Sequence, residues 1–409
     1  MKIWLKYIIG CVLGIIFCLV FPAGNEMVTK TLTFLSEFAL RIGRYALYPL
    51  LFFSFTMAVY ELREGSGLMK TGLLTAAVIA AAAVLQTAVG LVSVLIGSPQ
   101  RIPMFAEEVA GTISLDLTGM LLQLFPYSAF EIFVNSSFIL PLCIFAGFAG
   151  AGCAADKAAA KPALNLFDSL SRVCYAVFSF FIDMFAFALI VLAAGWTYRY
   201  REMLATALFG ELVLILVIDF VIIAGIVYPL LLRLLLGKIN PYRVLYASIA
   251  PVAAAFFSGD SNVALGVGMR HANESLGVRR RISAVTMPLF SVFSRGGTAL
   301  TITVSFIIIL KSYSSLGIPL QDIFWISGVA IALSFLLGNI PVGGTFIALA
   351  ILCSMYGRVF ESGYLILKPA AFFICAIAAA FDTLTNMFGT YLVARVNAMT
   401  TQREVHYFI

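Results

Sequence analysis

The chain has 409 residues, of which 62% are apolar and 11% charged, and its mean hydropathy is +1.03. Soluble domains carry about a quarter charged residues, so this composition excludes an ordinary soluble protein and indicates one that spans a membrane. The net charge of +6 does not indicate nucleic-acid binding, because the basic residues gather in the connections between apolar segments.

The first half contains six apolar segments, and crossing a bilayer takes about 20 residues. They cover residues 4–22, 38–60, 72–97, 134–153, 165–195 and 204–236. Lys2 and Lys6 precede an apolar run, which also fits a cleaved signal peptide, but no A-x-A site follows and many more spans do. Basic residues are more frequent in the connections on the side of the N-terminus, which predicts a cytoplasmic N-terminus. The runs "AAVIAAAAV" and "GFAGAGCAA" predict close helix contacts.

Two of these spans carry isolated acids, Asp183 and Asp219. Acids inside a membrane are costly and often functional, but a buried acid bonded to a neighbouring helix is an equally good interpretation. Enzyme chemistry has no visible motif: no nucleotide loop, GxSxG elbow or HExxH occurs. The seven cysteines lack metal-ligand spacing and are interpreted as small core residues. We therefore expect no enzyme, no cofactor and no firm metal site.

After residue 236 the apolar pattern is interrupted. "FFSGDSNVALGVGMRHANESLG" and "LSFLLGNIPVGGTFIALAIL" each break at Gly-rich or polar centres, and each piece is too short to span. "SRGGTALTITVSF" lies between them and "AAAFDTLTNMFGTYLVARV" follows. Paired broken segments indicate two re-entrant hairpins at a transporter's binding site, since non-helical backbone is tolerated in a membrane only where it is buried or lines a cavity. The alternative, kinked helices that bind no ligand, explains one such segment well but explains four consecutive segments poorly.

At these four segments the sequence resembles the dicarboxylate/amino acid:cation symporters, the glutamate and aspartate transporter family. "FFSGDSNVAL" is similar to the serine-rich first hairpin, "IPVGGTFIALAIL" to the second hairpin's tip, and "DTLTNMFGT" to the end of the last helix. The resemblance implies an all-α fold of eight transmembrane helices plus two hairpins, assembled as a homotrimer. It also implies that residues 1–236 form mainly a scaffold and that residues 237–409 form a transport core that moves like an elevator. Spans 3 and 6 of the first part are expected to support the transport core.

The resemblance places several residues at substrate-holding positions. These are Thr298, Thr383, Asn386, Ser261, Asn262, Gly343 and Gly344. Other positions depart from the family. The acids that ligate sodium there are Gly296 and Thr390 here, and Ala379 replaces the residue that pairs with a substrate's amino group. Hydroxyls and carbonyls can still hold a cation, but much local negative charge is missing.

The remaining candidates for cation contact are Ser294, Asn386, Thr390 and Asp260. Asp260 is equally suited to capping a helix at the first hairpin tip. The sequence thus leaves sodium and protons open as the coupling ion.

Arg295 and Asp382 are the unusual pair of this site. Asp382 stands where the family has an arginine that clamps a substrate carboxylate, and Arg295 replaces a nearby methionine. Opposite charges in a low-dielectric pocket should pair, because either alone is costly. Two interpretations remain open. The Arg295–Asp382 pair is a permanent ion pair that only fills the space left by the missing binding groups, or one or both residues exchange partners with the substrate or with a proton.

The sequence therefore predicts a symporter of a small carboxylate or amino acid in a cell (inner or plasma) membrane, with Arg295 as the anion clamp. An anion conductance or a ligand sensor of the same fold is the alternative. We expect lipid and a small-molecule substrate as partners, and no nucleic acid.

Overall fold

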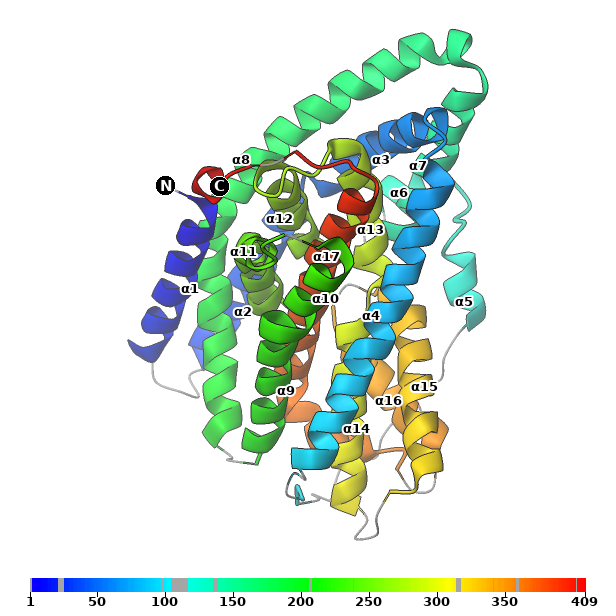
Figure 1. Cartoon of the computed structure of the whole chain (residues 1–409). Helices are drawn as coiled ribbons and strands as arrows, with labels where there is room; N and C mark the ends of the chain where they lie inside the picture. Colours follow the sequence, from blue (N-terminus) through cyan, green and yellow to red (C-terminus); the bar gives the residue numbers. More distant parts are fainter. Residues whose placement is uncertain are drawn as a thin grey trace.

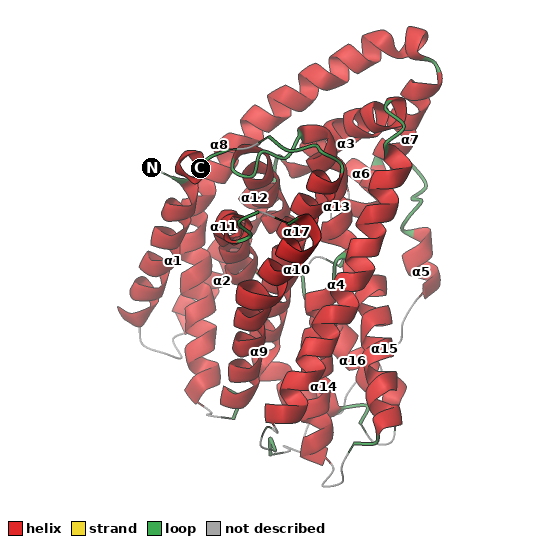
Figure 2. Ribbon diagram, in the orientation of Figure 1, coloured by secondary structure: helices red, strands yellow, loops and turns green. Residues whose placement is uncertain are grey.

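The computed structural model describes residues 2–20, 26–97, 99, 101–103, 117–134, 139–205, 208–237, 239–313, 318–340, 342–357, 360–401 and 403–409. Within these residues the fold is helical, and the one β-type pairing is an isolated bridge between Val278 and Thr400 (Figure 2). The prediction of an all-α membrane protein is confirmed.

The first half forms α1 (Ile3–Val20), α2 (Glu26–Arg44), α3 (Leu47–Glu64), α4 (Leu68–Gly97), α5 (Leu117–Leu122), α6 (Glu131–Val134), α7 (Ile139–Ala155), α8 (Lys157–Ala205), α9 (Gly210–Ile222) and α10 (Tyr228–Leu236). A π-helical segment, Ile223–Val227, joins α9 to α10. The chain turns at residues 45–46, so the predicted span 38–60 covers the end of α2 and most of α3. Residues 135–138, 206 and 207, in the predicted spans 134–153 and 204–236, lie outside the described residues.

The second half forms α11 (Tyr242–Ser258), α12 (Ser261–Glu274), α13 (Arg280–Phe293), α14 (Gly296–Tyr313), α15 (Leu320–Leu336), α16 (Gly344–Tyr356) and α17 (Ala371–Val396). Short 3₁₀ turns occur at Leu337–Asn339, Gly363–Ala370 and Val405–Tyr407.

Seven helical stretches within the described residues are long and apolar enough to cross a bilayer. They are Ile3–Val20, Glu26–Glu64, Leu68–Gly97, Lys157–Arg201, Gly210–Leu236, Arg280–Tyr313 and Gly363–Val396. Four apolar helices are shorter, namely α7, α11, α15 and α16. The 49-residue α8 is about 74 Å long at 1.5 Å per residue, so it extends well beyond a hydrocarbon core of about 30 Å.

Small residues let these helices approach closely, as the sequence predicts. A Cβ on Gly150 of α7 would lie 2.4 Å from the Thr56 carbonyl oxygen of α3, and one on Gly296 of α14 would lie 3.0 Å from the Ala83 Cα of α4. Helix association in membranes depends on such contacts, because lipid removes most of the hydrophobic gain between helices.

The two short helix pairs point in opposite directions along the bundle (Figure 1). The outer end of the α11–α12 pair lies beside the end of α17, where the Thr401 amide donates to the Gly277 carbonyl at 2.9 Å. The outer end of the α15–α16 pair lies beside the end of α14, where Phe360 packs on Tyr313 with ring centroids 5.0 Å apart. Their inner ends therefore meet near the middle of the bundle.

Candidate functional site

The site is built around a break between α13 and α14. The α13 helix ends at Phe293, and Ser294, at φ −83° and ψ 73°, leaves helical geometry. The helix resumes at Gly296, so Arg295 lies in the gap with its backbone between two helix ends. A break leaves the N–H groups at the start of α14 without partners in their own helix, so these groups need other acceptors where they are buried.

Asp382 of α17 supplies those acceptors. Its Oδ1 accepts from the amides of Gly297 at 2.8 Å and Thr298 at 3.3 Å, and its Oδ2 accepts from the Thr298 hydroxyl at 2.9 Å. The carboxylate is 2% exposed and sits at a helix N-terminus, where negative charge is stabilised. The close approach requires glycine at 297, because a Cβ there would lie 2.1 Å from the Phe381 Cβ.

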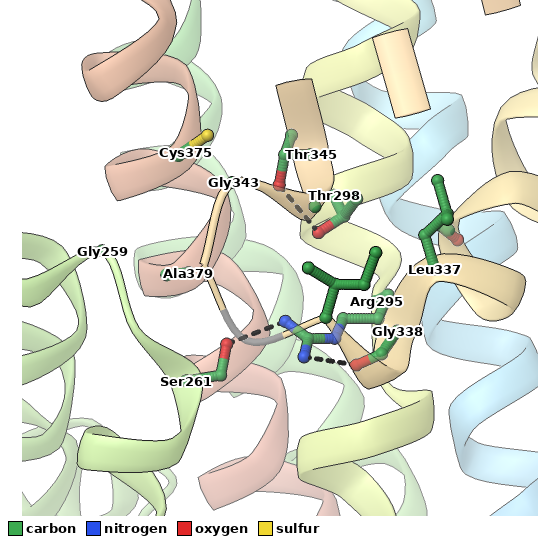
Figure 3. A pocket seen from close by; sticks show the side chains of 13 residues that line it. Gly259, Ser261, Arg295, Thr298, Leu337, Gly338, Gly343, Thr345, Cys375 and Ala379 are labelled. Carbon is green, nitrogen blue, oxygen red and sulfur yellow. Dashed lines mark hydrogen bonds between the residues drawn. The ribbon is translucent and has the colours of Figure 1, made fainter. Parts of the chain in front are cut away.

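Arg295 joins the inner ends of both short helix pairs (Figure 3). One terminal nitrogen donates to the Ser261 hydroxyl at 2.8 Å, and the other donates to the Gly338 carbonyl at 2.6 Å. The first nitrogen also lies 3.6 Å from Asp382 Oδ2, so the two charges form a buried ion pair. The predicted proximity of Arg295 and Asp382 is confirmed.

A small pocket lies where these elements meet. Its lining comes from both helix pairs, the α13–α14 break and α17: Gly259, Ser261, Arg295, Thr298, Ser334, Leu337, Gly338, Ile340, Gly343, Gly344, Thr345, Cys375 and Ala379. Ser261 and Gly343, at the inner ends of the two helix pairs, thus line the same pocket. Figure 3 shows the Thr298 and Thr345 hydroxyls, 3.4 Å apart, on one side of the pocket. Because Thr298 donates to Asp382, Thr345 is the donor to Thr298.

Gly343 and Gly344 occupy the turn into α16. Gly343 has φ +77°, a left-handed conformation that glycine adopts without strain, and it precedes the first residue of the helix. The first amides of α16 therefore lie at the pocket, where an anionic group is favoured.

Asp260 lies at the inner end of the other pair, outside the pocket lining. Its Oδ1 accepts from the Asn262 amide at 2.9 Å and caps α12, while its Oδ2 pairs with Arg44 of α2. Of the two predicted roles, the structure has the capping one. Asn262 itself is buried in the first turn of α12.

Three other predicted residues, Thr383, Ser294 and Asn386, are buried but do not line the pocket. The Thr383 and Ser294 hydroxyls are buried and have no hydrogen-bond partner among the described residues. With its nitrogen turned as hydrogen bonding requires, the Asn386 carboxamide donates to the carbonyls of Asp382 at 3.2 Å and Phe290 at 3.0 Å. Thr383 and Ser294 are sequence neighbours of the ion pair, and the Arg295 Nε is likewise buried without a hydrogen-bond partner among the described residues.

Thr390 lies on α17 two turns beyond Asp382, and it does not line the pocket. Its hydroxyl donates to the Met287 sulfur at 2.9 Å and lies 3.4 Å from the Thr286 hydroxyl. Of the residues predicted for cation contact, the structure brings Ser294 and Asn386 close to the break and leaves Thr390 and Asp260 apart from it. In the described residues no group of three His, Cys, Asp or Glu side chains is placed to hold a metal ion.

A polar cluster that the sequence did not indicate lies beside the break. Gln86 of α4 donates from its amide nitrogen to the hydroxyls of Tyr228 and, at 2.6 Å, Thr385, which lie 2.7 Å apart. The Gln86 carbonyl oxygen is buried and without a partner among the described residues. It faces Gly296, where a Cβ would lie 2.8 Å from it. The one signal in the sequence is a lone amide inside an apolar span.

The fold and site together define a multi-pass helical membrane protein in which two short helix pairs meet at a buried ion pair. The chain belongs to the sodium:dicarboxylate symporter family, which it matches over residues 3–399. This is a family of transporters and not of enzymes, as the sequence predicts.

Similar characterised proteins are amino acid transporters. The human neutral amino acid transporter A is 26% identical over 221 residues, which cover 54% of this chain and 41% of that protein. The human neutral amino acid transporter B(0) is 27% identical, over 50% of this chain and 38% of its own length. The serine/threonine transporter SstT of Streptococcus thermophilus (strain CNRZ 1066) is 25% identical, over 50% of each chain. The matched region thus spans at most half the length of these relatives.

Proposed function

We propose that this protein is a secondary active transporter that carries a small amino acid or carboxylate across the membrane together with a cation. The observation that carries the proposal is the Arg295–Asp382 pair, which lies at a helix break between two short helix pairs and beside a pocket. A zwitterionic amino acid matches this pair, because its carboxylate complements Arg295 and its ammonium complements Asp382. Family membership supports transport, and the relatives' names support amino acids as the substrate class.

Each candidate residue has a proposed role. Arg295 is the anion clamp, and Thr298, Thr383 and Asn386 provide hydrogen bonds. Ser261 and Asn262 at one tip, and the backbone of Gly343 and Gly344 at the other, close over the substrate. Thr383 supports this assignment, because its buried hydroxyl has no partner among the described residues.

We propose eight membrane spans and two re-entrant helix pairs. The spans are α1, α2–α3, α4, α7, α8, α9–α10, α13–α14 and α17, and the re-entrant pairs are α11–α12 and α15–α16. An even number of spans brings both termini to one side, in keeping with the hydrogen bond from Lys2 Nζ to the His406 carbonyl. That side carries Arg243, Arg279–Arg281 and Arg395, which lie beside the C-terminal residues Met399 and Phe408, and this supports a cytoplasmic assignment in a cell membrane.

Residues 1–236 then form mainly a scaffold that trimerises, and residues 237–409 form a transport core that moves as an elevator. The packing of α4 on α14, α13 and α17, and of α10 on α17, supports the expectation that spans 3 and 6 travel with the core. Sodium is a weak or absent driver in this proposal, because Gly296 and Thr390 lack carboxylates, and protons are the alternative.

The test begins with thermal-shift screening of amino and organic acids, with and without sodium. Cys375 lines the pocket, so a bound substrate should slow its alkylation in a variant whose other six cysteines are replaced. A second variant that retains only Cys153, on α7, is the control and should show no protection. Concentrative uptake of the same compound into proteoliposomes then establishes transport. Binding without concentrative uptake would identify a sensor or a conductance and overturn the proposal.

A further inference from the structure

A second buried carboxyl lies outside the site described above. Asp219 of α9 is 0% exposed and faces α4, where the Ser93 hydroxyl lies 2.8 Å from its Oδ2. Its Oδ1 is also buried and has no hydrogen-bond partner among the described residues. The surrounding face of α9 is apolar, with Leu212, Ile215 and Leu216. An ionised carboxylate in such a setting would have at most one hydrogen bond to stabilise two charged oxygens.

The charged groups nearby do not compensate Asp219. The helices packed against α9 are α4, α14, α17 and the π-helical segment with α10. Their charged residues are Lys70, Lys311, Asp382, Arg395 and Arg233, and α9 itself carries Glu211. The Lys311 ammonium donates to the Val94 carbonyl at 3.4 Å, and Asp382 is paired with Arg295. Asp219 forms no ion pair with any described residue.

The hydrogen atoms of the Ser93–Asp219 pair can be counted. Besides Asp219, the Ser93 hydroxyl oxygen lies 2.9 Å from the Gly90 carbonyl oxygen of its own helix. A serine hydroxyl has one hydrogen to donate, and both the carbonyl and an ionised carboxylate are acceptors only. An ionised Asp219 therefore leaves one of these two contacts without a hydrogen.

A protonated Asp219 satisfies both contacts. Its O–H donates to the Ser93 oxygen, and the Ser93 hydroxyl donates to Gly90. The partnerless Oδ1 is then the carbonyl oxygen of a neutral acid, which is less costly to bury than a charged oxygen. The π-helical segment that begins at Ile223, one turn after Asp219, is a kind of irregularity that is frequent at functional positions.

We propose that Asp219 and Ser93 form a proton-binding site, in which Asp219 holds a proton at neutral pH. The ligand is the proton itself, and Ser93 accepts the hydrogen bond of the neutral acid. Only the use of this proton in transport rests on the proposed function. The occupancy of the site does not.

Infrared spectroscopy of the full-length protein in lipid bilayers tests the proposal, because a protonated carboxyl gives a C=O stretching band apart from those of carboxylates and amides. At neutral pH the wild type should show such a band that Asp219→Asn lacks, and alkaline titration should remove it. The matched control is Asp183→Asn, since Asp183 lies 3.6 Å from Lys6 and 3.5 Å from Arg270 and is ion-paired. That control should leave the band unchanged.

Ser93→Ala provides a second, independent arm should Asp219→Asn fail to fold. It removes the acceptor of the proposed O–H and should shift the frequency of the same band. A wild type without a protonated-carboxyl band at neutral pH, or a band that neither Asp219→Asn nor Ser93→Ala alters, would overturn the proposal. Neither infrared measurement depends on whether the protein transports a substrate.

Discussion

Arg44, the last residue of α2, forms an ion pair with Asp260, which lies at the inner end of the α11–α12 pair and is 0% exposed. The contact joins two segments that are 216 residues apart. In the proposed elevator it links the scaffold to the transport core, so it holds the core in the position seen here.

Arg44→Gln should therefore destabilise this state. The substitution leaves the Asp260 carboxylate buried without its cation, and because the Arg44 side chain is 26% exposed we expect a loss of about 1–3 kcal/mol in unfolding free energy. Arg41→Gln, which removes an exposed pair with Glu37, is the control and should change stability by less than about 0.5 kcal/mol. Denaturant unfolding measures both. Equal losses in the two variants would show that the Arg44 contact is no stronger than a surface pair.

The Arg295–Asp382 pair should behave as one coupled unit. Asp382→Asn alone leaves Arg295 buried and unneutralised, with an expected loss of about 3–5 kcal/mol, whereas Asp382→Asn with Arg295→Met should lose less than the two single variants together. A double-mutant cycle on folded yield and on uptake measures the coupling. Recovery of yield without uptake assigns the pair to substrate binding, and recovery of both makes it structural. Additive losses would show that the residues do not interact.

Asp382 also caps α14, so a further variant of the double-mutant cycle can test the cap separately from the ion pair. An asparagine at 382 retains an oxygen for the Gly297 amide, but an alanine does not. In the Arg295→Met background, Asp382→Ala should therefore be less stable than Asp382→Asn by about 0.5–2 kcal/mol. Equal stability of the two double variants would mean that the cap contributes nothing.

Gly297→Ala should severely reduce folded yield. The added Cβ would lie 2.1 Å from the Phe381 Cβ and 2.9 Å from Asp382 Oδ1, so α14 and α17 must separate, at a cost of at least about 1–3 kcal/mol. Gly328→Ala is the matched control, because it also lies inside a helix but has no atom within 4 Å of the added carbon. Size-exclusion yield and thermal stability compare them. Similar behaviour of the two variants would contradict the close packing.

Transport should depend weakly or not at all on sodium, because Gly296 and Thr390 supply no carboxylate. Uptake at fixed pH with sodium replaced by choline is the measurement, and a strong loss would show that hydroxyls and carbonyls suffice. The single substitution Gly296→Asp should not increase sodium sensitivity, because the added Cβ would lie 2.8 Å from the Gln86 carbonyl oxygen. Adding Gln86→Ala should not rescue this variant, because the Ala83 Cα and the Ala82 carbonyl oxygen of α4 would still lie 3.0 Å and 3.1 Å from the added carbon.

The sequence predicted those parts of the site that depend on local pattern. Gly and polar residues interrupt apolar segments, so the helix break at Ser294 and Arg295 and the two short helix pairs could be expected. Two opposite charges in an apolar setting must meet, so the proximity of Arg295 and Asp382 could be expected too. The role of Asp382 as the cap of α14 could not, because the amides it accepts from become visible only when the helix start is placed.

Contacts between distant segments were beyond sequence reasoning. Arg44 reads as an ordinary basic residue at a helix end, and nothing near it indicates Asp260. Gln86, Tyr228 and Thr385 are single polar residues on three helices, and Thr385 is 299 residues from Gln86. In the sequence, each of them could equally be a side chain that forms a hydrogen bond only within its own helix. Only the packing of α4 and α10 on α17 brings them together.

The cap that Asp382 provides has a consequence for how the protein is made. Asp382 follows Gly297 by 85 residues, so at roughly 5–20 residues per second the ribosome produces it about 4 to 17 s after the start of α14. During that interval Arg295 and the first amides of α14 are without their carboxylate. The α13–α14 segment therefore cannot reach its final form as it leaves the ribosome, and the centre of the site is assembled only after α17 has entered the membrane.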